Sequence, residues 1–287
     1  MMQNILKSDE IVITSFKFQI IPVHSDEKLQ NFKGYLLRGL LFNWLQPLNR
    51  ELCKRLHLTE SAGNKILREY SISNYYEKLN ENSQIDIGVF ELNIFKMDFA
   101  NEIIKFLLNL KNTQFKVGDQ HCSLINTHVR TISISEIFNS GLTLNAFKLK
   151  FLTPTAFKNI NTKNYSIEPL PHKIIASLMK IWNSLYKNTS FECPKDLYNW
   201  TLKAIKLNPS NLKPRIVHSD MGKSVKFKGF IGRFSYSIDS KLKTEIDIQY
   251  RKWVYRLLKF GEYSHIGSGR TAGFGRYKIL ETTILEI

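Results

Sequence analysis

Residues 261–277 read GEYSHIGSGRTAGFGRY, and this glycine-rich stretch determines how the rest of the chain is interpreted. Its four closely spaced glycines and two arginines are Gly267, Gly269, Gly273, Gly275, Arg270 and Arg276. Such a loop either forms a turn that needs positive φ angles or presents backbone N–H groups to phosphate. The dinucleotide fingerprint requires a strand before the glycines and a helix after them. Here a helical pattern precedes the loop and a strand pattern follows it, so we expect no Rossmann site.

Positive charge is concentrated around the same stretch. The 287 residues include 41 Lys or Arg and 25 Asp or Glu, a net charge of +16. Between Lys213 and Lys278 there are 15 basic residues and 5 acidic ones. An excess of this size attracts polyanions, and aromatic residues, 12% of the chain, offer surfaces on which bases stack. The charge favours nucleic-acid binding, although random enrichment of surface lysine would give a similar composition.

Composition also limits the other classes of protein. The chain is 43% hydrophobic, but no run approaches the roughly 18 apolar residues that span a bilayer, and the first ten residues lack a signal core. The three cysteines are too far apart for a disulfide framework or a metal knuckle, and no histidine spacing matches a metal-ligand pattern. We therefore expect a cytoplasmic protein with no membrane contact, no metal and no cofactor.

Hydrophobic patterns in the first half predict the order β-α-β-β-α-β. Period-two alternation and β-branched runs indicate strands, and apolar residues three and four positions apart indicate helices. The expected strands are 11–22, 66–73, 85–95, 115–117 and 121–134, and the expected helices are 28–44, 50–56 and 98–111. This order is typical of a ferredoxin-like unit.

After a turn at Asn139, Ser140 and Gly141 the pattern restarts. The second half has an expected strand at 146–152, helices at 172–185, 195–206 and 244–260, a hairpin over 215–238 and a closing strand at 273–284. We predict an α+β fold of two tandem ferredoxin-like domains, residues 1–140 and 141–287. No repeated sequence is visible, so the duplication rests on element order alone.

The run GSGRTAGFGRY at 267–277 resembles the carboxyl-terminal glycine-rich loop of the CRISPR-associated endoribonucleases that process precursor CRISPR RNA, members of the RAMP superfamily. Other segments are similar to signatures of that family and follow the same order: FLTPT at 151–155, PLP at 169–171 and KGFIGR at 228–233. The resemblance covers nearly the whole chain and implies ferredoxin-like domains of RAMP type.

The resemblance also implies a reaction. A ribose 2′-hydroxyl would attack the adjacent phosphate without a metal and leave a 2′,3′-cyclic phosphate and a 5′-hydroxyl, and the enzyme would keep its product. This chemistry needs a base for the 2′-hydroxyl, an acid for the leaving oxygen and a cation for the phosphorane charge. Histidine suits the first two tasks because its ordinary pKa is about 6.5.

Position within the family then assigns the catalytic residues. In similar enzymes a His after the first long helix and a Lys shortly before the next strand do the chemistry, and His57 and Lys65 occupy these places. Phe42 stands at the family's Tyr position and cannot transfer a proton, so the partner is absent or supplied by Tyr35. His265, inside the glycine-rich loop, is a further auxiliary candidate. Alternatively, His57 only stabilises the end of a helix dipole.

RNA contacts are expected mainly from the second domain. Guanidinium groups form bidentate hydrogen bonds with phosphate and guanine, and basic residues alternate with phenylalanines along the expected hairpin. The expected contacts are Gly267, Ser268, Gly269, Arg270, Arg276, Lys226, Lys228, Arg233 and, on the first helix, Arg38. The interleaved Phe227, Phe230 and Phe234 either stack on bases or, as is more common, pack in the core.

Two functions follow from the resemblance. The first is an endoribonuclease that cuts precursor CRISPR RNA once per repeat. The alternative is a noncatalytic RAMP subunit that holds guide RNA within a CRISPR effector complex. The implied partners are CRISPR repeat RNA or precursor crRNA and, in the second case, other effector subunits, with the chain itself a monomer or homodimer. A structural or toxin-like RNA binder outside CRISPR systems is a third class.

Overall fold

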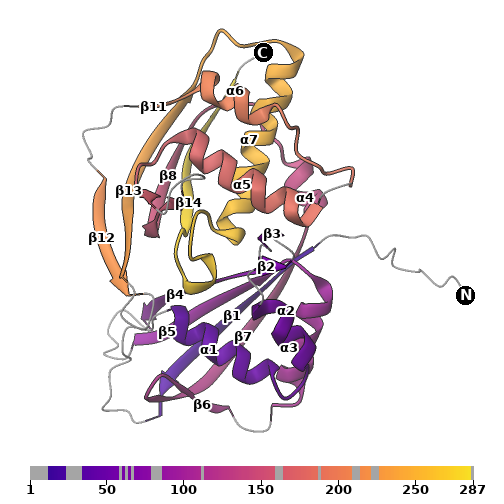
Figure 1. The fold of residues 1–287 in the computed structure, drawn as a ribbon, viewed down its shortest axis with the longest axis vertical. Coiled ribbons are helices and arrows are strands. Elements are labelled where there is room, and N and C mark those ends of the chain that lie inside the picture. The colour runs from indigo at the N-terminus through magenta and orange to yellow at the C-terminus, as the bar shows by residue number, and fades with distance from the viewer. Residues whose placement is uncertain are drawn as a thin grey trace, which may run out of the picture.

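A computed structural model of the chain describes residues 12–23, 34–57, 60–61, 64–65, 68–78, 86–110, 113–158, 164–186, 189–208, 214–220 and 226–285. Its strands fall into two five-stranded antiparallel sheets and two short two-stranded ribbons. Each large sheet belongs to one domain, and the chain passes from the first to the second between Ser133 and Leu144. Figure 1 shows the first domain below and the second above.

The first domain has the strand order β4-β5-β1-β7-β6. Its elements are β1 (Val12–Pro22), α1 (Gly34–Leu45), α2 (Arg50–His57), β2 (Glu60–Ser61), β3 (Asn64–Lys65), β4 (Tyr70–Lys78), β5 (Asp86–Ile94), α3 (Met97–Leu108), β6 (Gln114–Val117), β7 (Gln120–Ser133) and α4 (Ile134–Asn139). Counting β1, β4, β5 and β7 as strands one to four gives the order 2-3-1-4, which is the ferredoxin-like topology, with β6 added at the β7 edge.

Alternation along β1 sets the core of this domain. Phe16, Phe18 and Ile20 are all fully buried on one face of the strand. Trp44 of α1 packs edge-on against Phe18, with ring centroids 5.5 Å apart, and stacks on Phe106 of α3 at 4.8 Å. Period-two burial on the strand therefore meets the apolar faces of α1 and α3.

The second domain repeats the topology with the order β12-β13-β8-β14, and β11 shares the β13 edge with β12. Its elements are β8 (Leu144–Thr155), β9 (Phe157–Lys158), β10 (Tyr165–Ser166), α5 (Pro171–Tyr186), α6 (Leu197–Ala204), β11 (Ile205–Leu207), β12 (Arg215–Asp220), β13 (Lys226–Ile238), α7 (Glu245–Ser264), the 3-10 turn η1 (Arg270–Ala272) and β14 (Tyr277–Ile284). The prediction of two tandem ferredoxin-like domains is therefore confirmed.

Helix α7 positions the glycine-rich loop. Thr244 begins the helix with a capping box, in which its hydroxyl accepts from the Asp247 N–H and Asp247 accepts from the Thr244 N–H. Phe260 near the other end packs edge-on against Trp182 of α5, with centroids 5.1 Å apart. Both ends of α7 are thus fixed, and the chain leaves it at His265 to form the loop. None of the helices in the described part of the chain is long and apolar enough to cross a membrane.

Several predicted bounds differ from the structure, and for three of them the contacts give the reason. Strand β4 begins at Tyr70 and not at residue 66, because the chain first forms the β2–β3 ribbon. The expected strand to residue 134 ends at Ser133, whose hydroxyl accepts from the Ser135 N–H and starts α4. Helix α6 ends at Ala204 because the following residues pair with β13.

Residues of the first domain extend the core of the second domain into the junction. Ile13, Phe95 and Ile132 of the first domain belong to the same buried cluster as α5 and α7. The Phe95 and Phe260 rings lie 5.6 Å apart across the junction. Hydrogen bonds also connect the two domains. The Tyr263 carbonyl of α7 accepts from Asn93 Nδ2 of β5 at 3.0 Å and from a serine hydroxyl of β4.

Candidate functional site

The glycine-rich loop connects α7 to β14 and reaches the first domain at the junction (Figure 1). Gly269 and Gly273 flank η1 with φ of 77° and 86°, in the left-handed region. Gly275 has φ of 74°, and a Cβ placed there would lie 1.8 Å from the Ile266 carbonyl oxygen. The glycines therefore permit a tight turn that packs against its own chain.

Backbone N–H groups of the loop mostly bond within the protein. Gly267 N–H donates to Ser177 Oγ at 2.8 Å, and Ser268 N–H donates to the Ala156 carbonyl at 2.9 Å. Gly275 N–H donates to the Pro154 carbonyl at 3.1 Å. The expectation that Gly267 and Ser268 present these groups to phosphate does not fit this arrangement, because the donors are already used.

The two loop arginines also face the protein. Arg270 is 5% exposed, and its guanidinium donates to the carbonyls of Ser264 at 2.7 Å and Arg68 at 3.0 Å. Burial lowers the pKa of Arg270 to about 10. Arg276 is mostly buried and forms an ion pair with Glu91 of β5 at 3.4 Å. Both side chains tie the loop to the first domain, so in this structure neither presents the guanidinium to RNA as expected from the sequence.

His265 is likewise enclosed. The residue ends α7 with φ of 56° and is 1% exposed. Burial, together with the charges of Arg276 and Arg270, lowers the pKa of His265 to about 3. An imidazole with this pKa stays neutral at physiological pH and is a poor general acid or base. The auxiliary catalytic role expected for His265 therefore does not fit its surroundings.

Helix α2 ends at His57, and Lys65 lies in β3 opposite Glu60 of β2. The side chains of His57 and Lys65 lie outside the described residues. The chain that carries both runs from α2 to Arg68, which contacts the glycine-rich loop. The catalytic assignment remains a prediction.

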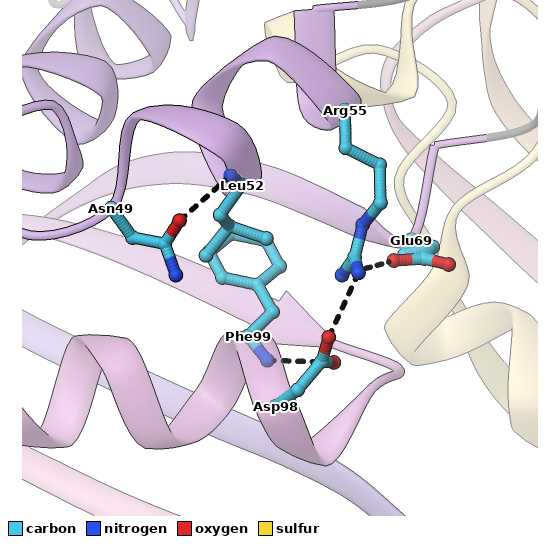
Figure 2. Close-up of polar contacts among 6 residues, drawn as sticks. All are labelled: Asn49, Leu52, Arg55, Glu69, Asp98 and Phe99. Atoms are coloured by element: carbon cyan, nitrogen blue, oxygen red, sulfur yellow. Dashed lines mark hydrogen bonds and ion pairs between the residues drawn. The ribbon is translucent and has the colours of Figure 1, made fainter.

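A polar network holds α2 in place (Figure 2). Arg55, two positions before His57, donates to Asp98 Oδ2 of α3 at 2.9 Å and to Glu69 Oε2 before β4 at 3.1 Å. At the start of α2, Asn49 Oδ1 accepts from the Leu52 N–H at 2.9 Å. Helix α2 is therefore anchored at both ends.

A cavity of about 380 Å³ lies beside this network. Three carboxylates, those of Glu51, Asp98 and Glu102, contribute to its lining. An acidic cavity of this kind does not suit a polyanion, so we do not regard it as part of an RNA site.

Helix α1 brings two of the expected residues to the junction. It begins at Gly34, where a Cβ would lie 2.2 Å from the Ala272 carbonyl oxygen, so only glycine allows this approach. Tyr35 and Arg38 on the first turns are partly exposed. Phe42 is buried in the core, with the Arg38 guanidinium 5.8 Å from its ring centroid. The position of the family's Tyr is thus filled by a core residue.

Two residues at the junction were missed by the sequence analysis. Arg68 Nη1 donates to Thr271 Oγ1 of the loop at 2.8 Å. Tyr70, the first residue of β4, is fully buried. Burial raises the pKa of the Tyr70 phenol, and the charges of Arg38, Arg68 and Arg270 act in the opposite direction. Neither residue lies in a motif. Only the pairing of β4 with β5 could have placed them at the junction between the domains.

The β12–β13 hairpin presents the remaining expected contacts. Lys226, Lys228 and Arg233 of β13 are exposed. The interleaved phenylalanines, Phe227, Phe230 and Phe234, are buried, and so they pack in the protein and are not available to bases. Strand β13 therefore presents basic side chains to solvent.

Among the described residues no group of three or more His, Cys, Asp or Glu could hold a metal ion.

Comparisons with known proteins agree with this architecture. Residues 149–277 match the family model of the CRISPR-associated endoribonuclease Cas6. No curated protein is significantly similar in sequence. The fold is similar to a Cas6 product complex, with 17% identity over 93% of this chain and 100% of that chain and a TM-score of 0.74.

Other solved structures give the same result. Thermus thermophilus Cas6 has 17% identity over 94% of this chain and 99% of that chain, with a TM-score of 0.67. A RAMP protein binding different RNA substrates has 15% identity over 93% and 100%, with a TM-score of 0.57. The two ferredoxin-like domains and the match of residues 149–277, which includes the glycine-rich loop, therefore make this chain similar in fold to Cas6 and RAMP proteins over nearly its whole length.

Proposed function

We propose that this protein is an endoribonuclease that cleaves precursor CRISPR RNA within its repeats. The observation that carries the proposal is the match of residues 149–277, including the glycine-rich loop, to the Cas6 endoribonuclease model. Structural relatives described as Cas6 complexes with product and with a substrate mimic support RNA as the ligand. The substrate is a transcript, so the proposed site of action is the cytoplasm.

His57 and Lys65 are the proposed catalytic residues. His57 would accept the proton of the ribose 2′-hydroxyl as that oxygen attacks phosphorus, and the bond from phosphorus to the 5′-oxygen would break. The same imidazole, now protonated, or water would return a proton to the leaving 5′-oxygen. The Lys65 ammonium would stabilise negative charge on the phosphorane. This scheme gives a 2′,3′-cyclic phosphate and a 5′-hydroxyl.

Phe42 makes the proposed enzyme slow. A missing acid or base costs about 10²- to 10⁴-fold in rate. Tyr35, which adjoins the contact between Gly34 and the loop, is the candidate replacement. Slow turnover is compatible with an enzyme that retains its product, and we propose that the cleaved repeat stays bound.

The test is cleavage of repeat RNA in excess EDTA. Wild type should cut once per repeat, and His57→Ala should lose at least about 10²-fold in rate while binding RNA as before. His128→Ala is the matched control, because His128 is exposed on β7, where its ring bonds Asn126. A 2′-deoxy substitution 5′ to the cut should stop cleavage without weakening binding.

Two outcomes would overturn the proposal. Intact RNA bound tightly by wild type and His57→Ala alike would identify a noncatalytic subunit that holds guide RNA. Cutting of the 2′-deoxy substrate at the same position would exclude attack by the 2′-hydroxyl.

A further inference from the structure

We propose that Arg38, Arg68 and Tyr70 form an anion site, beside η1, that holds one phosphate of the bound RNA. The residues come from α1, from the segment before β4 and from the first position of β4, and the sequence pattern gave no role to Arg68 or Tyr70. The inference rests on the proposed function only in taking RNA as the source of the phosphate.

Arg68 is held at the site by the glycine-rich loop. Its Nη1 donates to Thr271 Oγ1 at 2.8 Å, and its carbonyl accepts from Arg270 Nη2 at 3.0 Å. The backbone and one guanidinium nitrogen are therefore fixed. A guanidinium has five N–H donors in a planar fork, so donors remain for an oxyanion.

Positive charge at this place has no partner among the described carboxylates. Burial and the nearby charge of Arg38 both lower the pKa of Arg68, and only the Tyr70 phenol acts in the opposite direction, so no carboxylate opposes them. The closest acidic residue in the sequence, Glu69, bonds Arg55, and Glu91 of β5 bonds Arg276. Like charges at a half-buried position repel one another, so an anion that joins them relieves the repulsion.

The Tyr70 hydroxyl supplies an independent observation. Tyr70 is fully buried, and its oxygen forms no hydrogen bond of normal geometry among the described residues, although the side chains of Arg68 and Thr271 lie close enough to interact with it. The ring is fixed edge-on against Phe99 of α3, with centroids 5.7 Å apart. Buried hydroxyls are nearly always paired, and an unpaired one points to a missing ligand. A phosphate oxygen satisfies both this hydroxyl and the guanidinium groups around it.

Exposure of the groups sets the order of contact. Arg38 and Arg68 are partly exposed, whereas Tyr70 is covered. The phosphate therefore meets the two guanidinium groups first, and the hydroxyl donates once their side chains turn toward the ligand. Lys65 precedes Arg68 by three positions in the sequence, so we expect the phosphate held here to lie near the proposed cut.

The experiment measures RNA affinity against salt concentration in the His57→Ala background, where cleavage cannot interfere. Arg68→Gln should weaken binding about tenfold and reduce the slope of log affinity against log salt by about 0.7, the value for one contact with a single strand. Thr271→Val is the matched control, since it removes the partner of Arg68 and keeps the charge. The RNA affinity of Thr271→Val should stay within about twofold of that of the His57→Ala protein, because the Arg68 charge that attracts phosphate is retained.

Tyr70→Phe should affect protein stability and RNA affinity differently. Removal of an unpaired buried hydroxyl should leave the unliganded protein as stable as before, or more stable, in urea unfolding. The same change should weaken RNA binding by several-fold. Inorganic phosphate should raise the melting temperature of wild type and have a smaller effect on Tyr70→Phe and on Arg38→Gln.

Equal loss of affinity in Arg68→Gln and Thr271→Val would show that Arg68 only joins the domains, and would overturn the inference. Unchanged RNA affinity in Tyr70→Phe would do the same. If Arg68→Gln does not fold, Arg68→Lys, which keeps one charge without the planar fork, provides the comparison and should lose affinity but not salt slope. Failure of wild type to cleave RNA would overturn the proposed function and leave these binding outcomes to be judged separately.

Discussion

A single buried imidazole links stability to pH in this protein. His265 is enclosed at the end of α7, and its pKa is lowered from 6.5 in the unfolded chain to about 3. Below pH 6.5 the unfolded chain binds a proton that the folded protein does not accept. The folded state is therefore favoured fully above pH 6.5, and that contribution is lost as the pH falls toward 3.

We expect the free energy of unfolding to fall by about 1.4 kcal/mol between pH 7.5 and pH 5.5 from His265 alone. Urea unfolding at the two pH values measures it. In His265→Asn this part of the pH dependence should vanish, whereas His128→Ala, which changes an exposed ring, should retain it. If the unfolding free energy of wild type and that of His265→Asn depend on pH in the same way, the burial argument is contradicted.

Arginine shows why the candidate site could be predicted only in part. The basic last quarter of the chain predicted a charged RNA-binding region, but Arg251 is fully buried and donates to the carbonyls of Leu144, Asp239 and Leu242. Arg270 is used in the same way. Carbonyl partners come from distant elements, so neither spacing nor net charge distinguishes these arginines from the exposed Arg233 of β13.

At the scale of elements, strong periodicity was a reliable guide. The patterns of β1, α7 and the β12–β13 hairpin extend over many residues, and each lies within a few residues of its predicted range. The two-residue strands β2 and β3 depend on pairing with each other, for which the sequence holds no periodic signal. The start of β4 was misplaced for the same reason, and with it Arg68 and Tyr70.

Helix α2 also depends on contacts that the sequence does not reveal. Arg55 joins it to α3 and to the segment before β4 through Asp98 and Glu69 (Figure 2). All three side chains are partly exposed, so each ion pair stabilises the fold only slightly. Their geometric effect is larger, because they fix the end of the helix from which His57 extends.

Arg55→Met should therefore separate catalysis from stability. We expect the cleavage rate at saturating RNA to fall about tenfold, because misplacement of a catalytic group is costly, while unfolding free energy changes by less than about 1 kcal/mol. RNA affinity should not change. Lys54→Met is the control, since the ion pair of Lys54 is with Glu51 on its own helix. A normal rate in Arg55→Met, or parallel losses of rate and affinity, would refute a positioning role.

At the scale of the whole molecule, the junction is a continuation of the core. Phe95 is 2% exposed and packs in the cluster that centres on α5 and α7, although it follows a strand of the first domain. The glycine-rich loop adds polar contacts from Arg270 and Arg276 to the same surface. The domains therefore support each other, and an RNA site between them would have a fixed shape.

Phe95→Ala tests this coupling. Wild type should unfold in one calorimetric transition, because residues of the first domain complete the core of the second domain. Removal of the Phe95 ring should cost about 3–5 kcal/mol and split the transition in two, since the aromatic contact with Phe260 at 5.6 Å is lost. Phe16→Ala removes an equally buried ring from the core of the first domain alone. It should lower the melting temperature by a similar amount but preserve a single transition, so two transitions in Phe16→Ala, or one in Phe95→Ala, would show that the junction does not couple the domains.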